Sequence, residues 1–133
     1  MDNSNLQWVI KGVLARGCRP CFDDDVPSGF LLNAWLKELA GMEIKAVLCL
    51  LCKGELEDYY GTYGINLLAW YRHRGIMVGH VPIPDHLQTP VRKSDLVKIW
   101  STFRKLPKPC LIHCSAGIDR TGAAVQFIQK QRD

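Results

Sequence analysis

The stretch that decides the fold spans residues 110–122 and reads CLIHCSAGIDRTG. Its first four residues have the composition and length of a short buried strand. A helical pattern starts at Thr121, with Ala124, Val125 and Ile128 on one face. Between strand and helix lies a short loop, in which Gly117 allows the chain to curl without steric cost. This stretch therefore predicts a strand, a tight loop and a helix.

The rest of the chain repeats this alternation of strand-like and helix-like segments. Apolar runs at residues 44–51 and 76–83 are unbroken, as is typical of parallel strands covered on both faces, and residues 6–16 read as a hairpin or entry strand. Helices are predicted at residues 29–40, 54–71, 95–106 and 121–130. Ser28 and Ser94 are the expected N-caps of the first and third helices, and Gly41 ends the first. The second helix is expected to break between Gly61 and Gly64. We therefore expect a single α/β domain over residues 1–133, with a central, mostly parallel sheet of four or five strands and helices on both faces.

Composition narrows the class of protein. The 133 residues are 47% hydrophobic and 23% charged, which is ordinary for a globular domain. The net charge of +4 suits an anionic ligand, but it is small and dispersed, which argues against a nucleic-acid partner. There is no apolar run of the roughly 18 to 20 residues that span a bilayer, and no secretory signal. We therefore expect a cytoplasmic protein without a transmembrane segment.

The six cysteines raise the alternative of a zinc site, because four of them form two C-x-x-C pairs, Cys18/Cys21 and Cys49/Cys52. Cys49 lies in a predicted strand, where residues three apart point to opposite faces, so that Cys49 and Cys52 cannot easily share one metal. We favour small core residues and free thiols, as expected in a reducing compartment.

Two residues in the decisive stretch, Cys114 and Arg120, lie one loop turn apart, a spacing that can surround a tetrahedral dianion. The backbone N–H groups between them can point inward, and the following helix presents its positive end. Arg120 offers a planar pair of donors to two phosphoryl oxygens. The expected phosphate cradle consists of Ser115, Ala116, Gly117, Ile118, Asp119 and Arg120.

The same loop supplies a nucleophile. Helix N-termini and arginines favour the reactive thiolate form of cysteine. Cys114 would attack phosphorus, and water would hydrolyse the phosphocysteine intermediate. Thr121 can donate its hydroxyl to the departing sulfur, whereas His113 faces the other way along the strand and is expected to fix the loop by hydrogen bonds. This mechanism requires no metal and no organic cofactor.

Residues 113–121 match the pattern H-C-x-x-G-x-x-R-[S/T], and the chain thus resembles the protein tyrosine and dual-specificity phosphatase superfamily. An upstream block is similar to the kinase-associated dual-specificity phosphatases: Cys52-Lys53-Gly54-Glu55-Leu56, Tyr60, Leu67-Leu68, Tyr71, Gly75-Ile76 and Pro82-Ile83-Pro84-Asp85 through Pro90. The resemblance covers roughly residues 30 to 128. Relatives normally continue with further helices, so C-terminal helices are expected to be lacking here.

The resemblance implies a general acid on the loop after a strand, and Asp85 lies at that place. Asp119 is an unusual residue before the arginine; some relatives that act on phosphoinositides carry Asp there. Asp119 is therefore the alternative acid, while a favourable helix N-terminal position explains it equally well. Cys52 matches a position that forms a protective disulfide with the nucleophile in some relatives, so a reversible Cys52–Cys114 bond is expected.

These features together predict a phosphatase that hydrolyses phosphomonoesters on proteins, at phosphotyrosine and also at phosphoserine or phosphothreonine. One alternative substrate is a phosphoinositide or inositol phosphate. A pseudophosphatase that binds phosphorylated partners without turnover is a second alternative, although the presence of both Cys114 and Arg120 argues against it. A sulfur-transfer enzyme of the rhodanese kind would not require the Arg-Thr-Gly ending of the loop.

Overall fold

The computed structural model describes residues 6–24, 26–85 and 91–132; Pro90, part of the upstream block, lies outside them. The order of elements is β1 (Gln7–Ile10), β2 (Leu14–Gly17), α1 (Gly29–Gly41), β3 (Ala46–Cys49), α2 (Lys53–Tyr59), the 3-10 helix η1 (Gly61–Tyr63), α3 (Leu67–His73), β4 (Met77–His80), α4 (Lys93–Lys105), β5 (Cys110–His113) and α5 (Asp119–Arg132). Strands and helices alternate after the initial hairpin, as the sequence predicts.

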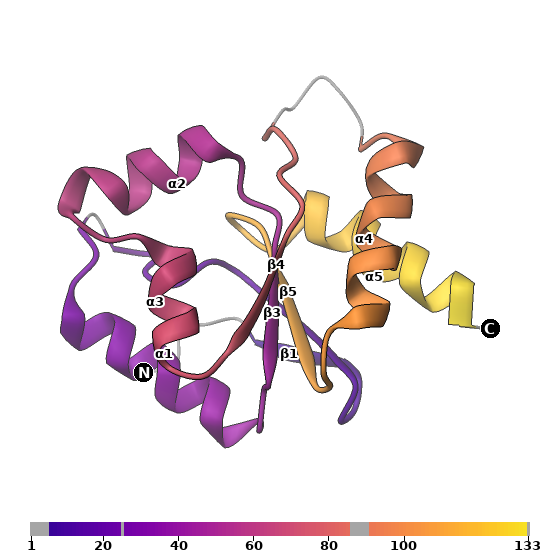
Figure 1. Ribbon diagram of the computed structural model, residues 1–133, viewed down its shortest axis with the longest axis horizontal. Helices are drawn as coiled ribbons and strands as arrows, with labels where there is room; N and C mark the ends of the chain where they lie inside the picture. The colour runs from indigo at the N-terminus through magenta and orange to yellow at the C-terminus, as the bar shows by residue number, and fades with distance from the viewer. Residues whose placement is uncertain (1–5, 25, 86–90, 133) are drawn as a thin grey trace.

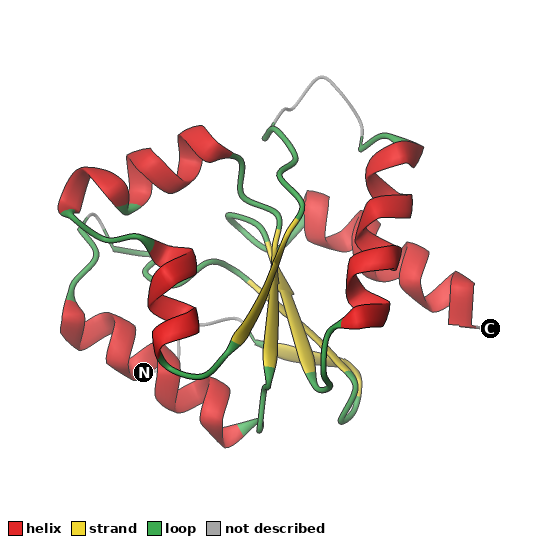
Figure 2. Cartoon of the chain, viewed as in Figure 1, coloured by secondary structure: helices red, strands yellow, loops and turns green. Residues whose placement is uncertain are grey.

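The strands form one five-stranded sheet in the order β1-β2-β5-β3-β4. Among the strands of the described residues, only β1 and β2 pair antiparallel; β5 lies between β2 and β3 and is parallel to both, and β4 is parallel to β3. Figure 1 shows α1, α2 and α3 on one side of this sheet and α4 and α5 on the other, and Figure 2 shows the strands converging between the two groups of helices. The predicted mostly parallel α/β fold is confirmed.

The core consists of two apolar clusters, one on each face of the sheet. The α4/α5 cluster contains Ile99, Phe103, Ala124, Val125 and Ile128 from the helices. The α1/α3 cluster contains Leu32, Trp35, Leu39, Leu67 and Tyr71 from the helices. Side chains of β5 alternate between them, so that Cys110 and Ile112 join the first cluster and Leu111 joins the second. This alternation decides which way the residues after β5 can face.

Most predicted boundaries agree with the structure, and one N-cap does not. Ser28 caps α1 by accepting a hydrogen bond from the Leu31 N–H at 3.2 Å, as predicted. The prediction of Ser94 as an N-cap was wrong, because α4 begins at Lys93 and Arg92 is the cap. The Arg92 N–H donates to Asp95 Oδ2 at 3.4 Å, so a carboxylate in the first turn satisfies the helix start instead of a serine hydroxyl.

No helix in the described ranges is long and apolar enough to cross a membrane. All six cysteines are free thiols. Cys49 is buried on β3, and burial raises its pKa to about 12, while Cys52 is half-buried at the start of α2. Across residues 6–24, 26–85 and 91–132, no group of three or more His, Cys, Asp and Glu side chains is arranged to hold a metal ion.

Candidate active site

The loop after β5 lies at the carboxyl edge of the parallel sheet and leads directly into α5, which begins at Asp119. Cys114, the first residue after the strand, is only 3% exposed. Gly117 has a φ of 77°, and a Cβ there would lie 2.4 Å from the Gly17 carbonyl oxygen, so only glycine fits this turn. The structure therefore has the strand, tight loop and helix that the sequence predicts, with the side chain of Cys114 at their junction.

The guanidinium of Arg120 is buried and held by two elements. Its Nη1 donates to Glu55 Oε1 at 2.6 Å and to the Ile83 carbonyl oxygen at 2.8 Å, and its Nη2 donates to Glu55 Oε2 at 2.8 Å. These bonds use both hydrogens of Nη1 and one of Nη2. The Nε hydrogen and the second Nη2 hydrogen, which lie on the same edge of the planar group, are left as the pair of donors that can meet two phosphoryl oxygens.

Glu55, on α2, is the site residue whose role sequence reasoning missed. Burial alone would raise its pKa, but hydrogen bonds from Arg120 and from the Cys52 N–H, together with the charge of Arg120, outweigh burial and lower it. For Arg120 the directions are reversed: burial alone would lower its pKa, but the hydrogen bonds and the charge of Glu55 outweigh burial and raise it. The pair is therefore charged on both sides, which fixes the orientation of the free donors. Glu55 stands in the upstream sequence block, but nothing in that pattern indicates that it meets Arg120.

The two candidate acids have different surroundings. Asp85 lies on the loop after β4, with its Oδ1 3.8 Å from Arg120 Nη2 and its side chain 56% exposed. Asp119 is exposed in the first turn of α5, where the helix dipole favours a negative charge. The structure brings Asp85 next to the buried arginine, whereas Asp119 lies at the solvent-facing start of the helix.

Thr121 combines complete burial with a polar group that has no partner. Its side chain is 0% exposed, and within the described part of the chain its Oγ1 makes no hydrogen bond. Buried hydroxyls without a partner are rare, because each costs free energy in the folded state. This group lies one residue beyond Arg120.

His113 belongs to a hydrogen-bonded chain on the opposite face of the sheet from Cys114. Its Nδ1 lies 3.2 Å from the Cys114 carbonyl oxygen, its Nε2 lies 2.9 Å from the Tyr71 hydroxyl, and Trp35 Nε1 donates to that hydroxyl at 3.2 Å. Burial lowers the pKa of His113 to about 4, so the ring is neutral at pH 7. Since a carbonyl only accepts, Nδ1 carries the proton and Nε2 accepts from Tyr71. The chain thus holds the Cys114 peptide in one orientation.

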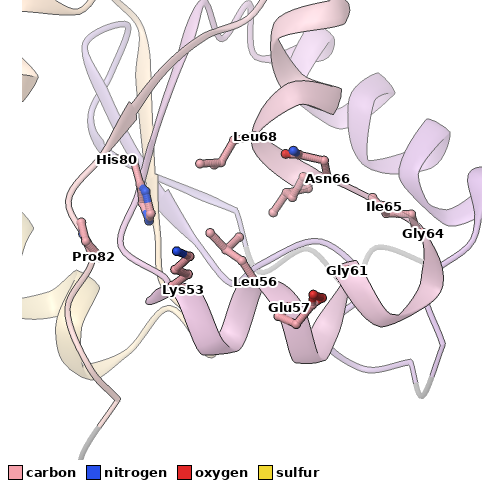
Figure 3. A pocket seen from close by; sticks show the side chains of 11 residues that line it. Lys53, Leu56, Glu57, Gly61, Gly64, Ile65, Asn66, Leu68, His80 and Pro82 are labelled. Carbon is pink, nitrogen blue, oxygen red and sulfur yellow. The ribbon is translucent and has the colours of Figure 1, made fainter.

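Beside these residues lies an apolar groove of about 660 Å³ between α2, α3 and the end of β4. Figure 3 shows Lys53, His80 and Pro82 on one side of it, and Leu56 and Leu68 pointing into it. Pro82 directly precedes Ile83, whose carbonyl oxygen binds Arg120. The groove therefore lies next to the segment that holds the arginine.

The fold and this loop define a class, the cysteine-dependent phosphatases. Residues 31–130 match the model of the family described as "Polymorphic toxin system, DSP-PTPase phosphatase", and the chain belongs to that family. No curated protein matches the chain.

Solved phosphatase structures share the fold. Tk-PTP in its active form is 27% identical, with a TM-score of 0.65 over 96% of this chain and 74% of that one. The core catalytic domain of the PP-IP phosphatase SIW14 from S. cerevisiae is 20% identical, with a TM-score of 0.68 over 99% of this chain and 69% of that one. P. aeruginosa TpbA is 19% identical, with a TM-score of 0.57 over 99% of this chain and 71% of that one. Family and fold together support phosphatase activity.

Proposed function

We propose that this chain hydrolyses phosphomonoesters through a phosphocysteine intermediate. Cys114 attacks phosphorus, and the N–H groups from Ser115 to Arg120 cradle the oxygens. Arg120 clamps two of them with its Nε and Nη2 hydrogens, and Asp85 protonates the leaving oxygen. Water then attacks the phosphocysteine and gives a proton to the Asp85 carboxylate, and the Thr121 hydroxyl donates a hydrogen bond to the Cys114 sulfur as the thiolate leaves. Residues 1–133 act as one catalytic domain of the dual-specificity type.

The observation that carries this proposal is the orientation of Arg120. Glu55 and the Ile83 carbonyl oxygen occupy three of its donor hydrogens, at 2.6 to 2.8 Å. The remaining parallel pair makes no hydrogen bond within the described residues, and Asp85 Oδ1 lies 3.8 Å from Nη2. Arg120 is only 3% exposed, and Glu55 and the Ile83 carbonyl oxygen hold the remaining pair of donors in one orientation. The buried hydroxyl of Thr121, which has no hydrogen-bond partner among the described residues, is a second group that a ligand could use.

Asp85 is the preferred acid because it approaches the site from a loop. Its Oδ1 lies 3.8 Å from Arg120 Nη2, close enough to reach a group attached to the phosphoryl centre. Asp119 is already accounted for by its favourable position in the first turn of α5. Asp119 therefore stays the alternative acid.

The first experiment measures hydrolysis of an aryl phosphate by the purified protein. Cys114→Ser is expected to reduce turnover by more than about 10³-fold. Asp85→Asn is expected to slow turnover most for substrates with poor leaving groups, because these depend most on protonation, and Asp119→Asn serves as the matched control. If Asp119→Asn has the larger, leaving-group-dependent effect, the two roles are exchanged. If the wild-type protein binds phosphopeptides without turnover, it is a pseudophosphatase and the proposal fails.

For the substrate we propose phosphotyrosine on proteins, with phosphoserine and phosphothreonine as further substrates, in line with the resemblance to the kinase-associated phosphatases. The second candidate is an inositol phosphate or phosphoinositide, favoured by Asp119 and by the fold similarity to a PP-IP phosphatase. Comparing kcat/KM across phosphotyrosine and phosphothreonine peptides, inositol phosphates and phosphoinositide vesicles separates these classes. A preference of more than tenfold for either class decides between them.

The family description refers to polymorphic toxin systems, and we propose that this phosphatase acts as the effector of such a system, in a reducing cytoplasm where its cysteines stay free. Induced expression in a bacterial host is expected to slow growth, and Cys114→Ser is expected to restore it. Equal growth with both forms would contradict the effector role.

A further inference from the structure

The outer side of the phosphate loop rests on the segment that leaves β2. Strand β2 is parallel to β5, and Gly17 is in register with His113. The two chains continue in contact, because a Cβ at Gly117 would lie 2.4 Å from the Gly17 carbonyl oxygen and 2.8 Å from the Cys18 nitrogen. The N-terminal hairpin and the two residues that follow it, Cys18 and Arg19, lie before the residues that match the family and form the wall behind the loop.

This wall hydrogen-bonds to three loop carbonyls. The backbone N–H of Arg19 donates to the Ser115 carbonyl oxygen at 2.8 Å. The half-buried side chain of Arg16, on β2, reaches the loop with one nitrogen: Nη2 donates to the Gly117 carbonyl oxygen at 2.8 Å and to the Ile118 carbonyl oxygen at 3.3 Å. These donors approach from the side of β2.

Fixing a carbonyl also fixes the N–H of the same peptide group. The loop peptides are trans, so each N–H points opposite to its carbonyl. With the Gly117 and Ile118 carbonyls turned toward Arg16, the N–H groups of Ile118 and Asp119 point away from β2. The Ile118 carbonyl also accepts the helical bond from the Gly122 N–H at 2.8 Å. The Ile118 carbonyl is thus already oriented by the helix, and the peptide group that Arg16 mainly orients is the one between Gly117 and Ile118.

That peptide most needs an external anchor. Gly117 adopts a left-handed φ of 77°, and glycine can occupy several backbone regions at similar cost, so the peptide can rotate easily. Rotation would turn a carbonyl oxygen toward the bound anion in place of an N–H donor, and would thus replace attraction with repulsion.

We propose that Arg16 is a positioning residue of the phosphate cradle, which binds the Gly117 carbonyl from behind and so aims the Ile118 N–H at the bound oxyanion. Arg16 does not touch the substrate. This inference rests on the proposed function in one respect only, namely that the loop from Cys114 to Arg120 binds a tetrahedral oxyanion.

The test measures oxyanion binding directly, with tungstate as the probe. Affinity is obtained by calorimetry, and the amide signals of Ile118 and Asp119 are followed by ¹⁵N NMR with and without tungstate. In the variant Arg16→Gln the side chain is too short to reach the Gly117 carbonyl. If that variant does not fold, Arg16→Met, which keeps an apolar stem, is used in its place. Arg16→Lys keeps the charge and a donor. Arg104→Gln makes the same change of charge in the last turn of α4 and is the control.

Loss of the anchoring hydrogen bond is expected to weaken tungstate binding about tenfold in the Gln or Met variant, and to remove the tungstate-induced shift of the Ile118 amide. The Lys variant is expected to bind within about threefold of wild type, and the Arg104 variant to match wild type. A folded Gln or Met variant that binds tungstate within twofold of wild type, with an unchanged Ile118 shift, overturns the proposal. Failure of the wild type to hydrolyse an aryl phosphate, with tungstate binding intact, would count against the proposed function and leave the role of Arg16 standing.

Discussion

The end of β5 presents two neighbouring residues to opposite faces of the sheet, and the two faces differ in how fully their polar groups are satisfied. His113 enters the α1/α3 side, where Trp35, Tyr71 and the Cys114 carbonyl oxygen form a continuous chain of hydrogen bonds. Cys114 belongs to the α4/α5 cluster, and Thr121, on α5, has a buried hydroxyl without a partner among the described residues. The polar side chains of the chain through His113 are thus satisfied on their face, whereas the Thr121 hydroxyl on the Cys114 side is not.

This difference suits two different roles, a rigid support around His113 and a reactive site around Cys114. A closed network of hydrogen bonds resists movement, because breaking any one of them leaves a buried polar group unpaired. Buried polar groups without a protein partner are uncommon, and a ligand, a water molecule or a reacting group can satisfy them. The Glu55–Arg120 pair connects the two faces, since α2 packs on one side and α5 on the other (Figure 1). It satisfies one edge of the guanidinium, and the other edge makes no hydrogen bond within residues 6–24, 26–85 and 91–132.

The largest expected effect comes from breaking this connection with Glu55→Gln. The variant leaves the buried Arg120 without its counter-charge, which is expected to lower the free energy of unfolding by about 3 to 5 kcal/mol. Misorientation of Arg120 is expected to lower kcat/KM by about 100-fold. Urea denaturation and steady-state kinetics measure the two effects, with Glu57→Gln on the exposed side of α2 as the control.

The same variant has a predictable pH dependence. The pKa of Glu55 is lowered in the folded protein, so the stability it contributes is present above its ordinary value of 4.5 and is lost as pH falls below that value. The difference between wild type and Glu55→Gln should therefore shrink on acidification. A difference that stays constant between pH 7 and pH 3 would show that the ion pair is not its cause.

The next largest effect is expected from protonation on the satisfied face. His113 has a folded pKa of about 4 against an ordinary value of 6.5, so the unfolded chain takes up a proton first as pH falls. Stability should decline between those two values by an amount on the order of 3 kcal/mol and then level off. Urea denaturation from pH 7.5 to 4 measures the decline, which His113→Gln should remove. Equal slopes in both proteins would contradict this origin.

A smaller effect is expected from opening the satisfied network at Tyr71. Tyr71→Phe leaves His113 Nε2 and Trp35 Nε1 without their partner, at an expected cost of about 1 to 3 kcal/mol in the free energy of unfolding. Because the open donors of Arg120 are untouched, kcat/KM should change much less than in Glu55→Gln. The control is Tyr63→Phe, whose side chain is 45% exposed. A loss of activity as large as that of Glu55→Gln would mean that the two faces are not separate.

The smallest effect concerns the helix that carries Trp35. Ser28→Ala removes the side-chain cap of α1 and should lower the unfolding free energy by about 1 kcal/mol, with no change in kcat/KM. Thermal unfolding measures this, and Ser101→Ala, exposed within α4, is the control. A change in kcat/KM would show that the satisfied face transmits small shifts to Cys114.

The sequence by itself determined the alternation of strands and helices, the parallel sheet and the loop around Cys114. These follow from local signals: unbroken apolar runs, helical spacing, and a glycine where the chain must curl. Local signals misplaced the start of α4, because the sequence offers two capping groups there, the Ser94 hydroxyl and the Asp95 carboxylate. In the structure the carboxylate accepts the hydrogen bond from the Arg92 N–H. The roles of Asp85 and Asp119 remain predictions for the first experiment on hydrolysis, and those of Thr121 and Cys52 also remain predictions.

Only the tertiary structure decided which distant groups meet. Glu55 pairs with Arg120 across 65 positions of the chain, and Arg16 reaches Gly117 across 101. No local pattern encodes such a pair, since each contact depends on how β2, β5 and α2 are placed by the order of strands in the sheet. The sequence thus determined the loop that can bind an oxyanion, and the packing around it decided which donors of that loop stay free and where they point.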